Sequence, residues 1–271
     1  MSTPGLVHPA PATALRRWAW VPVLAAGTTL FEAVRVTLIA TGNEALVPTL
    51  LLVGAVAIPV TFLTYLAGRP LDFISNGVTV AMTGLAGGVI GVVLAGLLEF
   101  DTLNGLGVGQ KLGVAVIEES AKLIAPAYLL VLGRTRGGAD GLILGAASGA
   151  GFATLETMGY AFTTIVNHHG DLTEVSQLLL VRGIWSPAGH MAWTGIIAWA
   201  LYRAVEQQFL LRSCGLLVAA AAAAVTLHTA WDSLQTPPAY AVIATLGLAT
   251  LAAALHWQSR IDTEQLPAPR R

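Results

Sequence analysis

Long runs of apolar residues recur along the whole chain and are separated by short polar segments. A helix needs about 20 mostly apolar residues to cross the hydrocarbon core of a bilayer. Eight runs reach that length, at about 18–40, 46–67, 77–98, 109–132, 139–165, 180–202, 214–234 and 239–258. Because backbone polar groups in lipid must bond within their own segment, each run is predicted to be a helix. The pattern predicts an all-α, polytopic transmembrane bundle of about eight spans, and the alternating segments of a membrane β-barrel are not seen.

The composition agrees with a membrane protein. Hydrophobic residues make up 55% of the 271 residues and charged residues 11%, with a mean hydropathy of +0.71. Soluble proteins carry about 25% charged residues. The net charge of −1 gives no reason to expect a nucleic-acid partner, and the single cysteine, Cys214, excludes an internal disulfide. The first apolar run continues well past the length of a signal peptide, so we expect it to be retained as a span.

Basic residues fall mostly in the tails and in every second loop, a bias that marks the cytoplasmic side of a membrane protein. The pattern therefore predicts that both termini are cytoplasmic, which agrees with an even number of spans. We expect a cytoplasmic tail at 1–17, one transmembrane helical domain at 18–258 and a second cytoplasmic tail at 259–271. Lys111 and Arg182 are exceptions, because they lie near the predicted outer ends of spans.

Two smaller features of the pattern concern how the helices are packed and joined. Gly141, Gly145 and Gly149 recur every four residues in the fifth run, and such a ridge of small residues lets two helices approach closely. The polar stretch at 166–179 is predicted to be the longest loop, and the acid Glu99 is predicted to lie in another loop.

Ionisable residues inside the apolar runs are the main departure from a plain helix bundle. A charge at the bilayer centre costs about 2.5–3.5 kcal/mol on insertion scales, so such residues usually face the protein interior and are functional. At a rise of about 1.5 Å per residue, four of these helices carry them about 9–15 Å below the outer face, so we expect one shared pocket. The residues are Glu118, Glu119 and Lys122 in the fourth run, Glu156 in the fifth, His190 in the sixth, and His228 and Asp232 in the seventh.

Spacing within these helices predicts local pairs. Glu118 and Lys122 lie four apart and share a helix face, whereas Glu119 points about 100° away. We therefore expect Lys122 to neutralise one carboxylate while the other faces the site. His228 and Asp232 also lie four apart, so the aspartate can orient the imidazole or share a metal with it. Each pair alone has a purely structural explanation, but their combination favours a functional site.

These residues fall in four motifs that resemble those of the PrsW family of intramembrane proteases, part of the superfamily of CAAX proteases and Abi-related proteins. Residues 118–122 read E-E-S-A-K and match the family's E-E-x-x-K motif. Residues 151–156 read G-F-A-T-L-E and match G-F-A-x-x-E. His190 matches the third motif, and residues 228–232, H-T-A-W-D, are similar to the fourth, H-x-x-x-D/N. The resemblance covers about 100–235, the expected motif-bearing core.

Two departures from these patterns matter for specificity. CAAX prenyl endopeptidases carry E-E-x-x-x-R and F-x-x-x-H motifs, whereas this chain has Lys122 at a different spacing and Glu156 in place of the histidine. CAAX specificity is therefore not expected. Thr157 stands where PrsW proteins often have asparagine, which is a minor departure. The superfamily also includes a non-catalytic scaffold subunit, so the fold alone does not guarantee activity.

The resemblance implies an intramembrane endopeptidase that cleaves membrane-anchored proteins near the outer face, with anti-sigma factors as one class of substrate. Peptide hydrolysis needs an activated water and a group that stabilises the developing oxyanion. In a first scheme, Glu118 or Glu119 is the general base, supported by Lys122, while His190 and His228 polarise the carbonyl.

A second scheme adds a metal ion, because the family is commonly classed as metallopeptidase. Zinc takes nitrogen and oxygen ligands and keeps an open position for water in catalytic sites. The compact H-E-x-x-H zinc motif is absent from the sequence. In this scheme the metal ligands are Glu156, His190, His228 and Asp232, and both schemes remain open on the sequence.

Two other classes of protein would use the same buried polar residues. A transporter or channel would employ them as a proton or ion relay, and paired breaks in helices at the midplane would favour it, but the pattern has no clear pair. A scaffold is the other alternative. The expected partners are the lipid bilayer and a membrane-anchored protein substrate. The resemblance and the high alanine and glycine content suggest a multi-pass protein of a bacterial plasma (inner) membrane.

Overall fold

The computed structural model describes residues 14–102, 109–168 and 171–264, and these consist of helices joined by short turns. No strand occurs within these ranges, which confirms the predicted all-α class. A short 3₁₀ turn, η1 (Glu44–Leu46), precedes α3. The α-helices are α1 (Ala14–Trp18), α2 (Trp20–Thr41), α3 (Val47–Ala67), α4 (Gly77–Thr102), α5 (Gln110–Val131), α6 (Gly137–Asn167), α7 (Leu172–Trp185), α8 (His190–Glu206), α9 (Leu211–Ser233) and α10 (Pro237–Glu264).

Not all of these helices are equally apolar. The α5 and α6 helices carry the acids Glu118, Glu119 and Glu156 of the predicted site, and α7 and α8 have only 14 and 17 residues. This mixture of apolar and polar helices is expected of a multi-pass membrane protein with an internal site. Five segments of the described chain are long and apolar enough to cross a membrane: Leu15–Thr41, Glu44–Ala67, Gly77–Phe100, Leu211–Ser233 and Pro237–Glu264.

The predicted sixth span, 180–202, is wrong as a single helix. The α7 helix ends at Trp185 and α8 begins at His190, with a turn between them. Pro187 has no N–H to donate, and Gly189 adopts non-helical dihedral angles of φ −96° and ψ −119°. The break therefore follows from local sequence, and it makes His190 the first residue of a new helix.

The predicted loop at 166–179 is also wrong. The α6 helix continues to Asn167, and α7 already begins at Leu172. Asp171 caps α7, because its Oδ1 accepts a hydrogen bond of 2.8 Å from the backbone N–H of Thr173. Helical hydrogen bonding thus extends through residues whose polarity alone indicated a loop.

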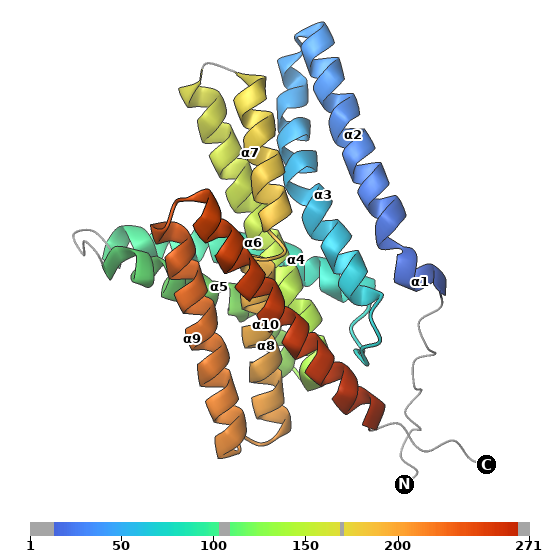
Figure 1. Cartoon of the computed structure of the whole chain (residues 1–271), viewed down its shortest axis with the longest axis vertical. Coiled ribbons are helices and arrows are strands. Elements are labelled where there is room, and N and C mark those ends of the chain that lie inside the picture. Colours follow the sequence, from blue (N-terminus) through green and yellow to red (C-terminus); the bar gives the residue numbers. More distant parts are fainter. Residues whose placement is uncertain (1–13, 103–108, 169–170, 265–271) are drawn as a thin grey trace.

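The 31-residue α6 runs along the length of the bundle (Figure 1). The α7 helix follows one half of it and α8 follows the other half, while α3 packs beside α7, and α9 and α10 pack beside α8. The break between α7 and α8 therefore lies near the middle of the molecule, where α6 passes it.

The small-residue ridge of α6 allows close helix packing, as predicted, and the helix that packs against it is α8. A Cβ atom added to Gly145 would lie 2.5 Å from the Cβ of Ala198 and 2.7 Å from the carbonyl oxygen of Thr194. One added to Gly149 would clash with the carbonyl oxygen of His190. Only glycine therefore allows α6 and α8 to approach closely enough to place His190 against α6.

A proline in α5 creates a second link to α6. Pro126 has no N–H, so the carbonyl of Lys122, four residues earlier, lacks its usual helical donor. The hydroxyl of Ser148 in α6 donates a hydrogen bond of 2.5 Å to that carbonyl. Such a side-chain donor satisfies a backbone group that lipid cannot. The interaction fixes the part of α5 that carries Lys122 against α6.

Candidate active site

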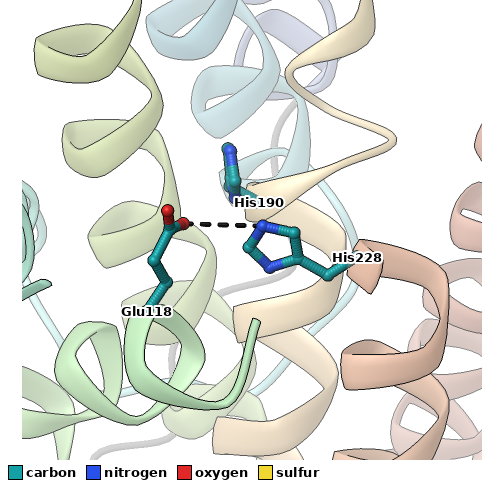
Figure 2. Close-up of side chains that lie close together, drawn as sticks. All are labelled: Glu118, His190 and His228. Carbon is teal, nitrogen blue, oxygen red and sulfur yellow. Dashed lines mark ion pairs between the residues drawn. The ribbon is translucent and has the colours of Figure 1, made fainter. Parts of the chain in front are cut away.

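Four helices bring the predicted acids and imidazoles to one place. Glu118 lies on α5, His190 begins α8, and His228 lies near the end of α9. One ligand-type atom from each of these three side chains lies within 4.8 Å of the other two, and Figure 2 shows them around a common space. Glu156 of α6 joins the group through His190. The prediction that residues on separate helices meet in one pocket is confirmed.

The side chain of Lys122 is fully buried at the centre of this group. Its Nζ lies 2.9 Å from Oε2 of Glu118, 2.9 Å from Oε1 of Glu119 and 2.8 Å from Nδ1 of His190. An ammonium has three N–H donors, so all of them are used. The expectation that Lys122 neutralises only one carboxylate is wrong, because it bridges both acids. Nζ also lies 3.8 Å from the ring centroid of Phe152, a cation–π contact.

The two adjacent acids have different surroundings. Oε1 of Glu119 faces Lys122 and lies 3.0 Å from Nδ1 of His228, and Oε2 accepts a hydrogen bond of 2.9 Å from the hydroxyl of Thr194. The side chain of Glu119 is 2% exposed and that of Glu118 is 10% exposed. Among the described residues, Oε1 of Glu118 accepts no hydrogen bond. Glu119 is therefore anchored on both oxygens, whereas Glu118 keeps one oxygen available.

The ring of His190 is held at both nitrogens. The ammonium of Lys122 can only donate, so Nδ1 of His190 accepts. Nε2 then carries the proton and donates to Oε2 of Glu156 over 3.0 Å. The rings of Phe152 and Trp193 approach edge-on, with centroid distances of 5.2 and 5.4 Å. These contacts fix both the tautomer and the orientation of the imidazole.

His228 is buried between aromatic and acidic side chains. Its ring stacks on Trp193 with a centroid distance of 4.9 Å and an interplanar angle of 25°. Nδ1 donates to Glu119, and Nε2 lies 3.5 Å from Oε2 of Glu118 and 3.7 Å from Oδ2 of Asp232. The predicted pairing of His228 with Asp232 is thus a 3.7 Å approach and not a hydrogen bond, and Glu119 is the closer orienting partner.

Arg182 of α7 is a site residue that the sequence analysis did not include. Its guanidinium donates a hydrogen bond of 2.7 Å to Oε2 of Glu156 and one of 3.1 Å to the hydroxyl of Thr157, and it lies over the ring of Tyr160. A signal was present, because Arg182 is an exception to the charge pattern of the loops. A cation within an apolar run needs a partner, and Glu156 is that partner.

Glu99 was predicted to lie in a loop, and this is wrong. It lies in α4, and its Oε1 is buried without a hydrogen-bond partner in the described part of the chain. Polarity next to a predicted span end gave no means of recognising that this acid belongs to a helix.

A small cavity of about 40 Å³ lies beside His190, between α6, the α7–α8 break and α9. Arg182, Ser186 and Trp231 contribute to its lining. The hydroxyl of Ser186 is buried and has no hydrogen-bond partner among the described residues. Buried donors without partners are rare in native proteins, so this hydroxyl is available to a bound water or carbonyl oxygen.

The donor set suits a metal ion. Glu118, His190 and His228 offer one oxygen and two nitrogens at close range, the ligand types and number that a catalytic zinc site uses. Three carboxylates, Glu118, Glu119 and Glu156, stand against two cations, Lys122 and Arg182, which leaves an excess of negative charge. Lys122 bonds the same Glu118 and His190 side chains, so a metal ion would compete with its ammonium for them. The residues present therefore fit a divalent cation.

The fold and the site define a membrane-embedded protein with a buried centre of carboxylates and imidazoles, the class that includes the intramembrane hydrolases. A sequence model described as "PrsW family intramembrane metalloprotease" matches residues 46–257, most of the chain. The chain therefore belongs to the PrsW family of intramembrane proteases, as its four motifs predicted. The match extends beyond the expected core of 100–235 and includes α3 and α4. No curated protein and no solved structure is similar enough to match this chain.

Proposed function

We propose that this chain is an endopeptidase that cleaves membrane-anchored proteins with a water activated by Glu118. The observation that carries the proposal is the contrast between the two neighbouring acids. Glu119 is bonded at both oxygens, whereas Oε1 of Glu118 accepts no hydrogen bond from a described residue and belongs to a carboxylate that lies beside His190 and His228. A general base needs an oxygen that can reach a water and its proton, which Glu118 offers.

In the proposed reaction, Oε1 of Glu118 takes a proton from a water whose oxygen attacks the scissile carbonyl carbon. The C–N bond then breaks, and Glu118 returns the proton to the departing nitrogen. Lys122 and Glu119 are both buried and fully bonded, so they hold the carboxylate of Glu118 and the imidazole of His228 in place. His228, whose Nε2 faces Glu118, orients the water.

Stabilisation of the oxyanion is assigned to the unpartnered hydroxyl of Ser186, which lines the small cavity beside His190. The guanidinium of Arg182 also lines this cavity, but it is bonded to Glu156 and Thr157 and serves to position His190. Preorganised donors of this kind typically lower the barrier by about 3–4 kcal/mol. Both ring nitrogens of His190 are already bonded, so polarisation of the carbonyl by His190 requires Lys122 to leave Nδ1.

A bound metal would be held by Glu118, His190 and His228, where zinc would supply a Lewis acid and a more acidic water. The alternative ligand set that includes Glu156 and Asp232 uses carboxylates with other partners. Oε2 of Glu156 is bonded to Arg182 and to His190, and Asp232 lies 3.7 Å from His228. We therefore assign Glu156 the task of positioning His190.

The proposed setting follows from the family and the charge pattern. We place the chain as a multi-pass protein of a bacterial plasma membrane, with the helical domain at 18–258 between cytoplasmic tails at 1–17 and 259–271. The substrates are proteins with a membrane anchor, cut near the outer face, and anti-sigma factors are one such class. The site lies among helices, so only a segment within or beside the bilayer reaches it.

The test is cleavage of a reporter protein with a single membrane anchor by the purified chain in liposomes. Glu118→Gln is expected to lower kcat by at least about 100-fold. Glu32→Gln is the matched control, because Glu32 is an acid in α2 that pairs with Arg35 outside the site. Full activity of the Glu118→Gln, Glu119→Gln and His228→Ala variants would refute the proposed site. Loss of activity in Glu119→Gln alone would transfer the role of base to Glu119.

One observation favours a second candidate, a proton or ion relay. The break between α7 and α8 lies beside His190, and interrupted helices are typical of transporter sites. The break has no counterpart in a repeated half among the described helices. A pH-sensitive dye in the same liposomes distinguishes the two functions, since a relay predicts proton flux without cleavage.

A further inference from the structure

A second cavity lies away from the candidate active site, where α8 ends and α9 begins. Its volume is about 260 Å³, and α8, α9 and α10 all contribute to its lining. The side chains that matter here are Trp199 and Arg203 of α8, Gln207 just after α8, Arg212 and Ser213 of α9, and Trp257 of α10.

The cavity is built on regular helix faces. Trp199 and Arg203 are four residues apart and so share one face of α8, and Gln207 is the residue that follows the helix. Trp199 is buried, and its Nε1 donates a hydrogen bond of 2.9 Å to the side chain of Gln258 in α10. Its ring meets that of Trp257 edge-on at a centroid distance of 5.5 Å, and Trp257 is 53% exposed. This wall is therefore held in place without any ligand.

The charge of the cavity is positive. Nη1 of Arg203 donates a hydrogen bond of 2.6 Å to Oε2 of Glu206. Arg212 forms no ion pair with any described residue. It is the second residue of the 23-residue α9, whose N-terminus has no side-chain cap. The positive end of the α9 dipole is offset by the negative end of the α8 dipole, which lies at the same place. Two arginines against one carboxylate therefore leave a net positive charge.

We infer that this cavity binds the phosphate group of an anionic phospholipid. Guanidinium groups form paired hydrogen bonds with phosphate oxygens. Tryptophans are enriched where a membrane protein meets the headgroup region, and basic pockets between helices on the cytoplasmic side bind anionic headgroups. Arg203 and Arg212 flank one of the basic loops from which the cytoplasmic side was predicted. Leu216 and Ile261 complete the lining with apolar carbon, which suits the glycerol part of a lipid.

Free phosphate has the same anionic chemistry, so the experiment must separate the two sources. The full chain is purified in detergent and titrated with phosphatidylglycerol, phosphatidylcholine or inorganic phosphate, and bound lipid is counted by native mass spectrometry. We expect retention of phosphatidylglycerol and not of phosphatidylcholine. Inorganic phosphate at millimolar concentration should not displace the lipid. Displacement would show that the site recognises free phosphate and would overturn the lipid assignment.

Variants locate the site. Each basic residue near an anionic headgroup raises the affinity about fivefold. Arg212→Gln should therefore weaken lipid binding about fivefold, and the double variant Arg203→Gln/Arg212→Gln about 25-fold. Arg212 is exposed, so its single variant tests the site even if loss of Arg203, whose stem packs close to Gly138, disturbs folding.

Arg134→Gln/Arg136→Gln is the matched control. It removes two exposed arginines from the turn between α5 and α6, outside the cavity. Unchanged lipid binding in the Arg212→Gln variant, or an equal loss in this control, would show that general surface charge and not the cavity holds the lipid.

Discussion

The guanidinium of Arg182 donates a hydrogen bond to the same Oε2 atom of Glu156 that accepts from Nε2 of His190, over 2.7 and 3.0 Å. The three side chains come from α7, α6 and α8. They form a chain of charge-assisted hydrogen bonds that ends at the candidate catalytic group. Arg182 therefore acts on the site through Glu156, as an outer partner that orients the imidazole.

Arg182→Gln is expected to lower kcat for a membrane-tethered reporter by about 10–100-fold, the usual cost of losing an outer orienting partner. KM should change little, because Arg182 is expected to position His190 more than to bind substrate. The control is Arg134→Gln, an exposed arginine in the turn before α6. A raised KM with unchanged kcat would instead mean that Arg182 contacts the substrate directly.

The two adjacent glutamates should differ in stability as well as in activity. Glu119 bonds Lys122, Thr194 and His228, so Glu119→Gln disrupts a buried network and is expected to lower the free energy of unfolding by about 3–5 kcal/mol. Glu118→Gln leaves those bonds in place and should lose activity with a smaller loss of stability. Unfolding of both variants in detergent, followed by circular dichroism, measures the difference. Equal losses would remove the distinction between an anchoring and a reacting acid.

The helices themselves could be predicted from the sequence, because apolar runs long enough for a bilayer admit little else. The sixth run shows the limit of that argument. The run is apolar on both sides of Ser186 and Pro187, so hydropathy predicts one continuous helix. The helix is interrupted because Pro187 has no N–H and Gly189 has non-helical dihedral angles. Hydropathy measures how favourably a segment transfers into lipid, and it says nothing about whether the helix is continuous. Pro187 was the signal in the sequence that a new helix begins near His190.

The site could be predicted as a set of residues but not as a set of partners. Burial costs identify Glu118, Glu156 and His190 as residues that must face the interior. The cost of burial does not tell which acid pairs with Lys122. In the structure, Lys122 is bonded to both Glu118 and Glu119. That choice depends on the rotation of α5 against α8, which packing across three helices determines.

The contact between α6 and α8 offers a direct test of the packing. Gly145→Ala places a methyl group 2.5 Å from the Cβ of Ala198 and is expected to reduce the free energy of unfolding by about 1–3 kcal/mol. Gly159→Ala in the same helix is the control, because a Cβ there meets nothing within 4 Å. Alanine should stabilise that position by up to about 1 kcal/mol. Similar effects at the two positions would show that α6 and α8 are not in close contact.

Metal content should depend on one particular acid. Elemental analysis of protein purified without chelators is expected to find about one zinc ion per chain, since three N and O ligands with an open position are typical of catalytic zinc. Removal of the ion by a chelator should abolish cleavage, and added zinc should restore it. Because Glu118 lies within 4.8 Å of the ligand atoms of both histidines, Glu118→Gln should lose most of the metal.

Asp232→Asn should keep more of the metal than Glu118→Gln, because Oδ2 of Asp232 contacts only His228 within the group, at 3.7 Å. Glu156→Gln separates the two ligand sets most clearly. If Glu156 positions His190, its loss should weaken zinc binding by about 10–100-fold without abolishing it. The opposite result would be complete loss of zinc in Glu156→Gln together with full retention of zinc in Glu118→Gln. It would mean that Glu156 is a direct ligand and that Glu118 acts only as the base. If a preparation without stoichiometric metal is active, the metal is not needed, and the carboxylates with their buried cations carry out the hydrolysis.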